Sequence, residues 1–311
     1  MHGSIYCVGM TIPASTTRRA LDVAAVGAAL RRAARAPAAP WLHTEVARRM
    51  AERLRVIRLA PQRVIEWWGF TGAGAVSLKA AYPQAQRLII EPTGELCRRS
   101  RVLSCTPWWS VQHWRGPRVE VQEESSEIAG QAQLVWANMV LHAQVDPLAL
   151  MARWHDLLQT DGVVMFSCLG PGSLVELRRL YAGLSWPEPA AAFVDMHDLG
   201  DMLVQAGFAA PVLDQETLTL HWASPQALLV ELRGMGVNAA PHRHAGLRTP
   251  RWRERLTNEL SALAGPDGRL RLSFEVVYGH AFKAQPRARP GEPTRVSLED
   301  MRAMVRSHPA R

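Results

Sequence analysis

Cysteine, lysine and long apolar runs are all scarce in this chain of 311 residues. The cysteines form no Cys-X-X-Cys pair and lie far apart, at Cys7, Cys97, Cys105 and Cys168. Structural zinc sites and disulfide frameworks use closely spaced cysteines, so we expect reduced thiols and a cytoplasmic location. No apolar run is long enough to span a bilayer, and the first residues lack the basic start and apolar core of a signal peptide. We therefore expect neither membrane insertion nor export.

Lysine occurs only at Lys79 and Lys283, so arginine supplies nearly all of the positive charge behind the net charge of +8. Arginine favours fixed geometry with carboxylates and phosphates, and a basic surface suggests an acidic partner such as a nucleic acid or an acidic protein. The alternation of arginine with aromatic residues that single-strand binders use is absent. We therefore expect no nucleic-acid partner. A genome rich in arginine codons explains the arginine excess equally well.

The motifs of common hydrolases and phosphate-binding enzymes are also missing. The sequence has no Gly-X-Ser-X-Gly nucleophile, no His-Glu-X-X-His pair and no P-loop. His242 and His244 lie in a loop without a carboxylate or cysteine at ligand spacing, so the sequence predicts no metal site.

A glycine-rich segment, VIEWWGFTGAGA at residues 64–75, is the strongest local signal. Val64–Glu66 reads as a short buried strand, and Ala75–Ala81 has a helical pattern. A strand that runs into a glycine turn and opens a helix permits positive φ and brings backbone N–H groups close to a ligand. The glycines that we expect to bind a cofactor in this way are Gly69, Gly72 and Gly74. Two bulky residues, Trp68 and Phe70, stand among them.

Acids end the first two predicted strands. Glu66 ends the first, and Glu91 ends a second apolar strand that begins at Arg87. The separation of about 25 residues is near the spacing at which nucleotide-binding folds hold ribose hydroxyls. We expect Glu91 to accept hydrogen bonds from the ribose, because two carboxylate oxygens match a vicinal diol. We expect Glu66 to hold the glycine segment and to face a cationic ligand group, although a surface acid at a strand end is the plainer interpretation.

Three further residues are candidates for the site. Asn138 ends a fourth predicted strand, at the edge where such sheets bind ligands, and it could present a carbonyl to the cofactor. His142 follows about one helical turn later and is a catalytic candidate, although a lone histidine is often structural. Arg233 lies near the end of a predicted helix, where a cation is favourable in any case, and could instead hold a substrate carboxylate.

Strands and helices alternate from Val64 to Cys168, which predicts a doubly wound, mostly parallel α/β sheet. Two more strands follow at Val212–Trp222 and Leu270–Phe282, and the second is compatible with an antiparallel edge strand. Two helices, at Thr16–Arg35 and Trp41–Ile57, precede the first strand and suggest a lid over the ligand edge. We expect one domain at residues 16–284 with a helical cap at 16–60, a flexible segment at 1–15 and a disordered tail at 285–311.

Several segments together resemble a known family. VIEWWGFTGAG is similar to the first motif of class I S-adenosylmethionine methyltransferases, LIIE to their second acidic strand, and LVWANMVLH to the segment after their fourth strand. The later segments GVVMFSCLGPGSLVELRRLY, FVDMHDLGDMLVQAGF and LLVELRGMGVNA resemble the BioC-type malonyl-acyl-carrier-protein O-methyltransferases of biotin synthesis. The resemblance covers roughly Thr16 to Lys283 and is more specific in the C-terminal half.

The resemblance implies a class I Rossmann-like, seven-stranded sheet and S-adenosyl-L-methionine as cofactor. It implies methylation of the free carboxylate of malonyl-loaded acyl carrier protein, an acidic partner that suits the positive charge. Apart from the resemblance, we expect a cytoplasmic monomer. In this reading Glu66, Gly72, Glu91 and Asn138 match cofactor positions, and Arg233 matches a basic position. Trp68 and Phe70 replace glycines of the family, so a degenerate relative that only binds a partner, or a small-molecule methyltransferase, remains an alternative.

Overall fold

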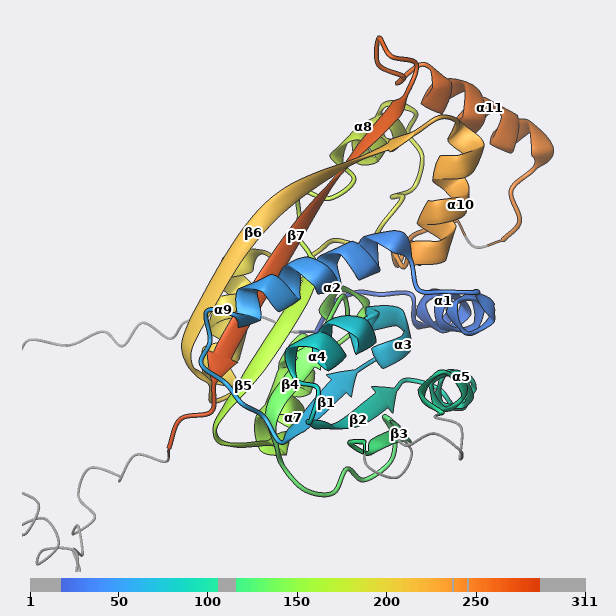
Figure 1. Ribbon diagram of the computed structural model, residues 1–311. Coiled ribbons are helices and arrows are strands. Elements are labelled where there is room, and N and C mark those ends of the chain that lie inside the picture. Colours follow the sequence, from blue (N-terminus) through green and yellow to red (C-terminus); the bar gives the residue numbers. More distant parts are fainter. Residues whose placement is uncertain (1–17, 106–115, 237, 245, 286–311) are drawn as a thin grey trace, which may run out of the picture.

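The fold is built on one seven-stranded sheet with strand order β3-β2-β1-β4-β5-β7-β6 (Figure 1). The computed structural model describes residues 18–105, 116–236, 238–244 and 246–285. Neighbouring strands among β1 to β5 pair in parallel, whereas β7 pairs antiparallel with both β5 and β6. The strands are β1 Arg63–Trp67, β2 Gln86–Glu91, β3 Val119–Glu123, β4 Ala132–Ala137, β5 Leu158–Leu169, β6 Ala209–Trp222 and β7 Leu270–Phe282.

The strand at Leu270–Phe282 is antiparallel, as predicted, but its expected place at the edge is wrong. It forms hydrogen bonds with β5 on one side and with β6 on the other, so β6 is the edge strand. Its alternating pattern does not distinguish these positions, because alternation reports which face is buried and not how many neighbours a strand has.

Helices cover both faces of the sheet. α2 and α4 contribute to an apolar core with β1, β4 and β5, and α7 and α9 pack in a second core on the other face. The helices are α1 Val23–Arg35, α2 Trp41–Leu54, α3 Gly69–Gly72, α4 Ala75–Ala81, α5 Gly94–Ser104, the 3-10 turn η1 Leu141–Ala143, α7 Pro147–Leu157, α8 Val175–Gly183, α9 Met196–Gln205, α10 Pro225–Met235 and α11 Pro250–Ser261.

Side-chain caps fix where several helices begin. The Asp22 carboxylate accepts the backbone N–H of Ala25, so α1 begins at Val23 and not at the expected Thr16, which lies outside the described residues. In the same way, Ser224 caps α10 and accepts the N–H of Ala227, with proline in the first helical turn as the sequence predicts.

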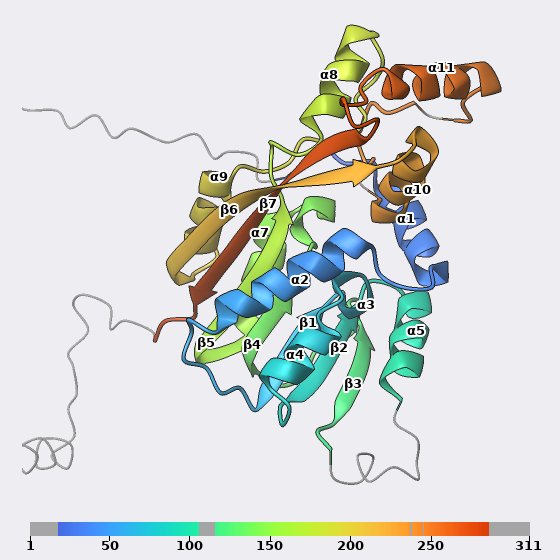
Figure 2. The same cartoon turned by 45° about the horizontal axis from the view of Figure 1, so that its top comes forward.

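The two N-terminal helices pack in different places. α1 lies beside α5 and the end of α10, near the edge where the parallel strands end (Figure 2). α2 instead lies across one face of the sheet, and its fully buried side chains Leu42, Val46 and Met50 belong to the same core as Leu134 and Met165 of the strands. The expected lid is therefore α1 alone, because α2 is a core layer.

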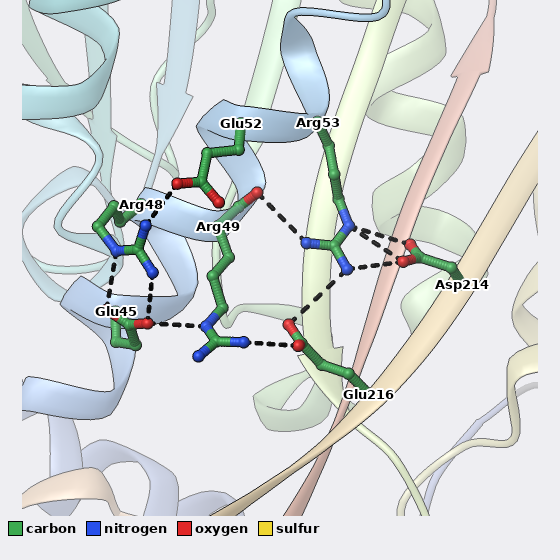
Figure 3. Close-up of polar contacts among 7 residues, drawn as sticks. All are labelled: Glu45, Arg48, Arg49, Glu52, Arg53, Asp214 and Glu216. Atoms are coloured by element: carbon green, nitrogen blue, oxygen red, sulfur yellow. Dashed lines mark hydrogen bonds and ion pairs between the residues drawn. The ribbon is translucent and has the colours of Figure 1, made fainter.

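Arginines of α2 connect this helix to the edge strand (Figure 3). Arg49 Nη1 lies 2.6 Å from Glu216 Oε2, and Arg53 Nη2 lies 2.6 Å from Asp214 Oδ2. The Arg53 guanidinium also lies 3.6 Å from the ring centroid of Tyr278 on β7. α2 is thus held over β7 and β6 by ion pairs as well as by its apolar face.

Some expectations fall outside the described residues, namely the flexible segment at 1–15 and the tail from residue 286 onward. Across the part of the chain that the structure describes, no helix combines the length and apolar character required to cross a bilayer.

Candidate active site

The glycine-rich segment forms the short helix α3 and not an open loop. The left-handed φ values of this segment belong to Trp68 and Ala73, each at 53°, and none of its glycines has a positive φ. The sequence-based expectation on this point is wrong. The glycines instead permit close packing, because a Cβ at Gly69 would lie 2.6 Å from Ile89 Cγ2. A Cβ at Gly72 would lie 3.2 Å from the Asn138 carbonyl oxygen.

The bulky residues of this segment point into the protein. Trp68 and Phe70 are only 6% and 8% exposed. Trp68 Nε1 donates to Glu124 Oε2 at 2.7 Å, and the Arg99 guanidinium lies 5.3 Å from the Phe70 ring centroid. A non-glycine residue in the left-handed region costs about 1–2 kcal/mol, so the buried ring of Trp68 and its hydrogen bond offset a strained backbone.

Glu66 is buried beneath the glycine segment. Its Oε2 accepts a hydrogen bond from Arg87 Nη2 at 2.7 Å, so its cationic partner in this structure is a residue of the chain. Its Oε1 lies against the backbone of Gly74, since a Cβ there would be 2.8 Å from this oxygen and 2.5 Å from Trp136 Nε1. Burial raises the pKa of Glu66, and the Arg87 charge opposes that rise.

Glu91 lies at the end of β2 and is fully buried, and its two carboxylate oxygens differ in their hydrogen bonding. Oε1 accepts the backbone N–H of Phe70 at 2.7 Å and the Ser100 hydroxyl at 2.5 Å. Oε2 is buried and has no hydrogen-bond partner. Burial raises the pKa of Glu91 to about 7. One oxygen therefore fixes α3 to α5, and the other is a buried acceptor without a hydrogen-bond partner.

Asn138 joins three elements at the end of β4. Its Nδ2 donates to the carbonyl oxygens of His43 and Gly72, at 2.8 and 2.5 Å. Its Oδ1 accepts the Ser167 hydroxyl at 2.6 Å. Each polar atom of the side chain is thus engaged within the chain, and the amide positions α2 and α3 around the site. The expectation that it presents its side-chain carbonyl to a ligand does not match these contacts.

A mainly apolar cavity lies beside α3 and the turn after β4, and Glu66, Glu91 and Asn138 are not among its lining residues. Its walls come from α1, α2, α3, η1 and the end of α10, and they include Leu30, Trp68, Met139 and Met235. Its volume of about 50 Å³ holds a few water molecules. Pockets for drug-sized ligands are typically about 300–1,000 Å³, so this cavity as described is too small to hold a nucleoside.

Two histidines are the titratable residues of the cavity wall. His142 was a candidate from the sequence, and His43 was not. Their ring centroids are 6.4 Å apart, and His43 Nδ1 donates to the Thr71 carbonyl at 2.8 Å. Burial lowers the pKa of His43 to about 4 and that of His142 to about 3, so both rings are neutral at pH 7. The sequence could have pointed to His43, because it lies beside Leu42 on the apolar face of α2 and is therefore expected to be buried.

Arg19 is another residue that sequence reasoning missed. Its guanidinium donates to the carbonyl oxygens of Leu141 and His142, at 3.1 and 2.8 Å, and thereby fixes the turn that carries the His142 ring. Arg233, by contrast, is exposed on α10 and does not line the cavity, although the next three residues do. Among the described residues, no cluster of histidine, cysteine and acidic side chains could bind a metal ion.

Comparison with solved structures supports the fold. The chain is similar to the YcgJ protein of Bacillus subtilis, with a TM-score of 0.51, 10% identity and coverage of 76% of this chain and 98% of that one. It is also similar to a candidate methyltransferase of Bacillus halodurans, with a TM-score of 0.50, 12% identity and coverage of 76% and 99%. The sheet order and these neighbours are those of class I Rossmann-like methyltransferases, as the sequence predicts.

No protein-family model matches the chain, but comparison with individual curated sequences identifies its family. The malonyl-[acyl-carrier protein] O-methyltransferase of Laribacter hongkongensis is 37% identical over 273 residues, which cover 86% of this chain and 89% of the relative. The protein of the same name from Gallionella capsiferriformans is 36% identical, with coverage of 86% and 93%. The chain therefore belongs to the malonyl-[acyl-carrier protein] O-methyltransferase family.

Proposed function

We propose that this chain transfers a methyl group from S-adenosyl-L-methionine to the free carboxylate of a malonyl group on acyl carrier protein, as in biotin synthesis. The names of the similar proteins support the substrate. The observation that carries the proposal is the cavity, whose titratable side chains among the described residues are His43 and His142, and both stay neutral at pH 7. Such a site suits a reaction that needs no acid or base.

The chemistry explains why a neutral cavity suffices. A malonyl carboxylate is ionised at pH 7, so it attacks a methyl carbon without losing a proton first. When bound, S-adenosyl-L-methionine supplies that methyl group on a positively charged sulfur. The remaining task is to align the reactants and to remove water, which would otherwise solvate the carboxylate and weaken it as a nucleophile. The apolar side chains of α1, α10 and Met139 perform the second part.

The residues at the strand ends fit the cofactor in chemical terms. The unpartnered Oε2 of Glu91 can accept a ribose hydroxyl, as the sequence predicts for this residue. Glu66, the three glycines and Asn138 shape the surrounding backbone. His142 would contact the methyl acceptor as a neutral ring. Cofactor entry requires the small cavity to widen, and Trp68 is the bulkiest side chain of its wall.

The proposed function is tested by incubating the purified chain with malonyl-acyl carrier protein and S-adenosyl-L-methionine, and by measuring the carrier's mass. We expect the addition of one methyl group. Acetyl-acyl carrier protein, which has no free carboxylate, should remain unmodified. Methylation of free malonate at a similar rate would instead indicate a small-molecule methyltransferase.

A second candidate is a degenerate relative that binds a partner without methyl transfer. It is favoured by the buried side chains of Trp68 and Phe70 and by the small cavity. Calorimetric titration with S-adenosylhomocysteine separates the two. Binding by the parent chain supports the enzyme. No binding by the parent, together with binding by the Trp68→Gly/Phe70→Gly variant, would establish that the bulky residues have closed the site.

We also infer a cytoplasmic, monomeric enzyme. The buried, free thiols of Cys97 and Cys168 suit a reducing compartment. Light scattering during size-exclusion chromatography gives the mass in solution and tests the monomer directly.

A further inference from the structure

A group of arginines lies on α1, on α10 and on the segment after α10, next to residues that line the cavity. α1 and α10 pack together there, and a Cβ at Gly236 would lie 2.7 Å from Ala29 Cβ. Both helices line the cavity with small residues and carry arginines immediately beside them. We call these arginines the rim patch, which consists of Arg31, Arg32, Arg233 and Arg243.

The rim patch concentrates positive charge. Arg31, Arg32 and Arg233 are exposed and have no acidic partner among the described residues. Burial and repulsion from the other three members lower the pKa of Arg32, so these charges lie close to one another. Only Arg243 is paired, through Nε at 2.6 Å from the Asp22 carboxylate.

The arginines of α2 differ from those of the rim patch in their partners. Arg48, Arg49 and Arg53 on that helix each have acidic partners within the chain (Figure 3). Arg31, Arg32 and Arg233 of the rim patch have no such partner among the described residues, and their mutual repulsion is unfavourable in the isolated chain. An anionic partner would relieve this repulsion when it binds.

We propose that the rim patch is the docking surface for the acidic face of the acyl carrier protein. This inference rests on the proposed function and adds where the partner binds. A carrier protein presents its acyl group on a flexible arm, so it must dock at the rim of the cavity that receives that group. Arg31 follows Leu30, Arg32 precedes Ala33 and Arg233 precedes Gly234, and Leu30, Ala33 and Gly234 all line that cavity. Arg233 is thereby assigned to the partner and not to the malonyl carboxylate.

The test reverses the charge of two residues that do not line the cavity, in the variant Arg31→Glu/Arg32→Glu. We expect the Kd for holo-acyl carrier protein and the KM for malonyl-acyl carrier protein to rise at least about tenfold. The kcat at saturation, the KM for malonyl-pantetheine and the Kd for S-adenosylhomocysteine should remain within about twofold, because these measurements do not require docking.

Arg55→Glu/Arg58→Glu is the matched control. These two arginines are exposed just after α2, at the opposite end of that helix from α1, and have no acidic partner among the residues described. The control makes the same change in net charge and should leave carrier affinity unchanged. An equal loss in the control, or an unchanged Kd in the test variant, would overturn the proposal.

Two further outcomes separate docking from chemistry. If Arg233→Glu raises the KM for malonyl-pantetheine as strongly as that for the loaded carrier, Arg233 binds the malonyl group and its assignment to docking is wrong. If the parent chain binds holo-acyl carrier protein through the rim patch but does not methylate malonyl-acyl carrier protein, the docking surface stands and the proposed function fails. The conservative variant Arg31→Lys/Arg32→Lys should retain most of the affinity and shows whether the fold tolerates substitution here.

Discussion

Glu91 loses contact with water when β2, α3 and α5 pack together, and this changes how its charge affects stability. The unfolded carboxyl ionises near its ordinary pKa of 4.5, whereas the folded pKa is about 7. Between these values the folded chain holds one more proton than the unfolded chain at this position. The free energy of unfolding therefore falls as the pH rises through this window.

We expect Glu91→Gln to remove this loss, since glutamine does not titrate. Relative to the parent, the free energy of unfolding should rise by up to about 3 kcal/mol between pH 4.5 and 7.5. Urea unfolding at a series of pH values measures this difference. Glu95→Gln, at an exposed carboxyl on α5, is the control, and an equal change in slope for both variants would contradict the prediction.

His43 affects stability in the opposite direction. Its pKa falls from 6.5 to about 4 on burial, so the unfolded chain binds more protons between these values. Stability is fully present above pH 6.5 and is lost as the pH falls toward 4, by up to about 3 kcal/mol. His43→Asn can keep an N–H near the Thr71 carbonyl. It should reduce the fall in the free energy of unfolding between pH 6.5 and 4. The exposed His197→Asn variant should lose stability between pH 6.5 and 4 as the parent does. If His43→Asn also loses as much stability as the parent over this range, His43 is not the residue responsible.

At the scale of single elements, the strand ends were predictable because buried apolar runs stop at polar residues. Glu91 is the last residue of β2 and Asn138 directly follows β4, as the sequence indicates, whereas β1 continues one residue past Glu66 to Trp67. Their hydrogen-bond partners were not predictable, since they come from distant parts of the chain. Asn138, for example, donates to the carbonyl of a residue 95 positions away.

The helical state of α3 was also missed. A Gly-Phe-Thr-Gly sequence has low helix propensity, and the helix forms where its glycines pack tightly on β2 and the end of β4. The position of β7 between β5 and β6 was missed for a related reason, because it depends on pairing between strands and not on local pattern.

The ion pairs between α2 and β6 give a prediction at the same scale. Arg49 and Arg53 are about one-third exposed, so we expect Arg49→Ala/Arg53→Ala to lower the free energy of unfolding by about 1–2 kcal/mol, and less at high salt. Arg48→Ala is the control, because its partners Glu45 and Glu52 both lie on α2. Its effect should be much smaller, because exposed ion pairs within one helix contribute little to stability. Chemical denaturation at low and high salt measures both, and equal effects would show that the bridge to β6 adds nothing.

At the scale of the whole molecule, the net charge of +8 favours encounter with acidic partners. If docking is electrostatic, kcat/KM for malonyl-acyl carrier protein should fall about tenfold between low and physiological ionic strength, because salt screens exposed charges. The rate with malonyl-pantetheine should change little. Steady-state kinetics with both substrates over a salt series provides the comparison, and parallel slopes would argue against an electrostatic encounter.

The place of β7 has a consequence for biosynthesis. Leu270–Phe282 is the last described strand in the chain, yet it lies between β5 and β6 and hydrogen-bonds to both. Until residue 282 has left the ribosomal exit tunnel, β6 has no strand to pair with. One edge of β5 also remains unpaired. The parallel strands β1 to β5 can pair during translation, but the sheet closes only afterwards, so a chain truncated before β7 would expose two unpaired strands to aggregation.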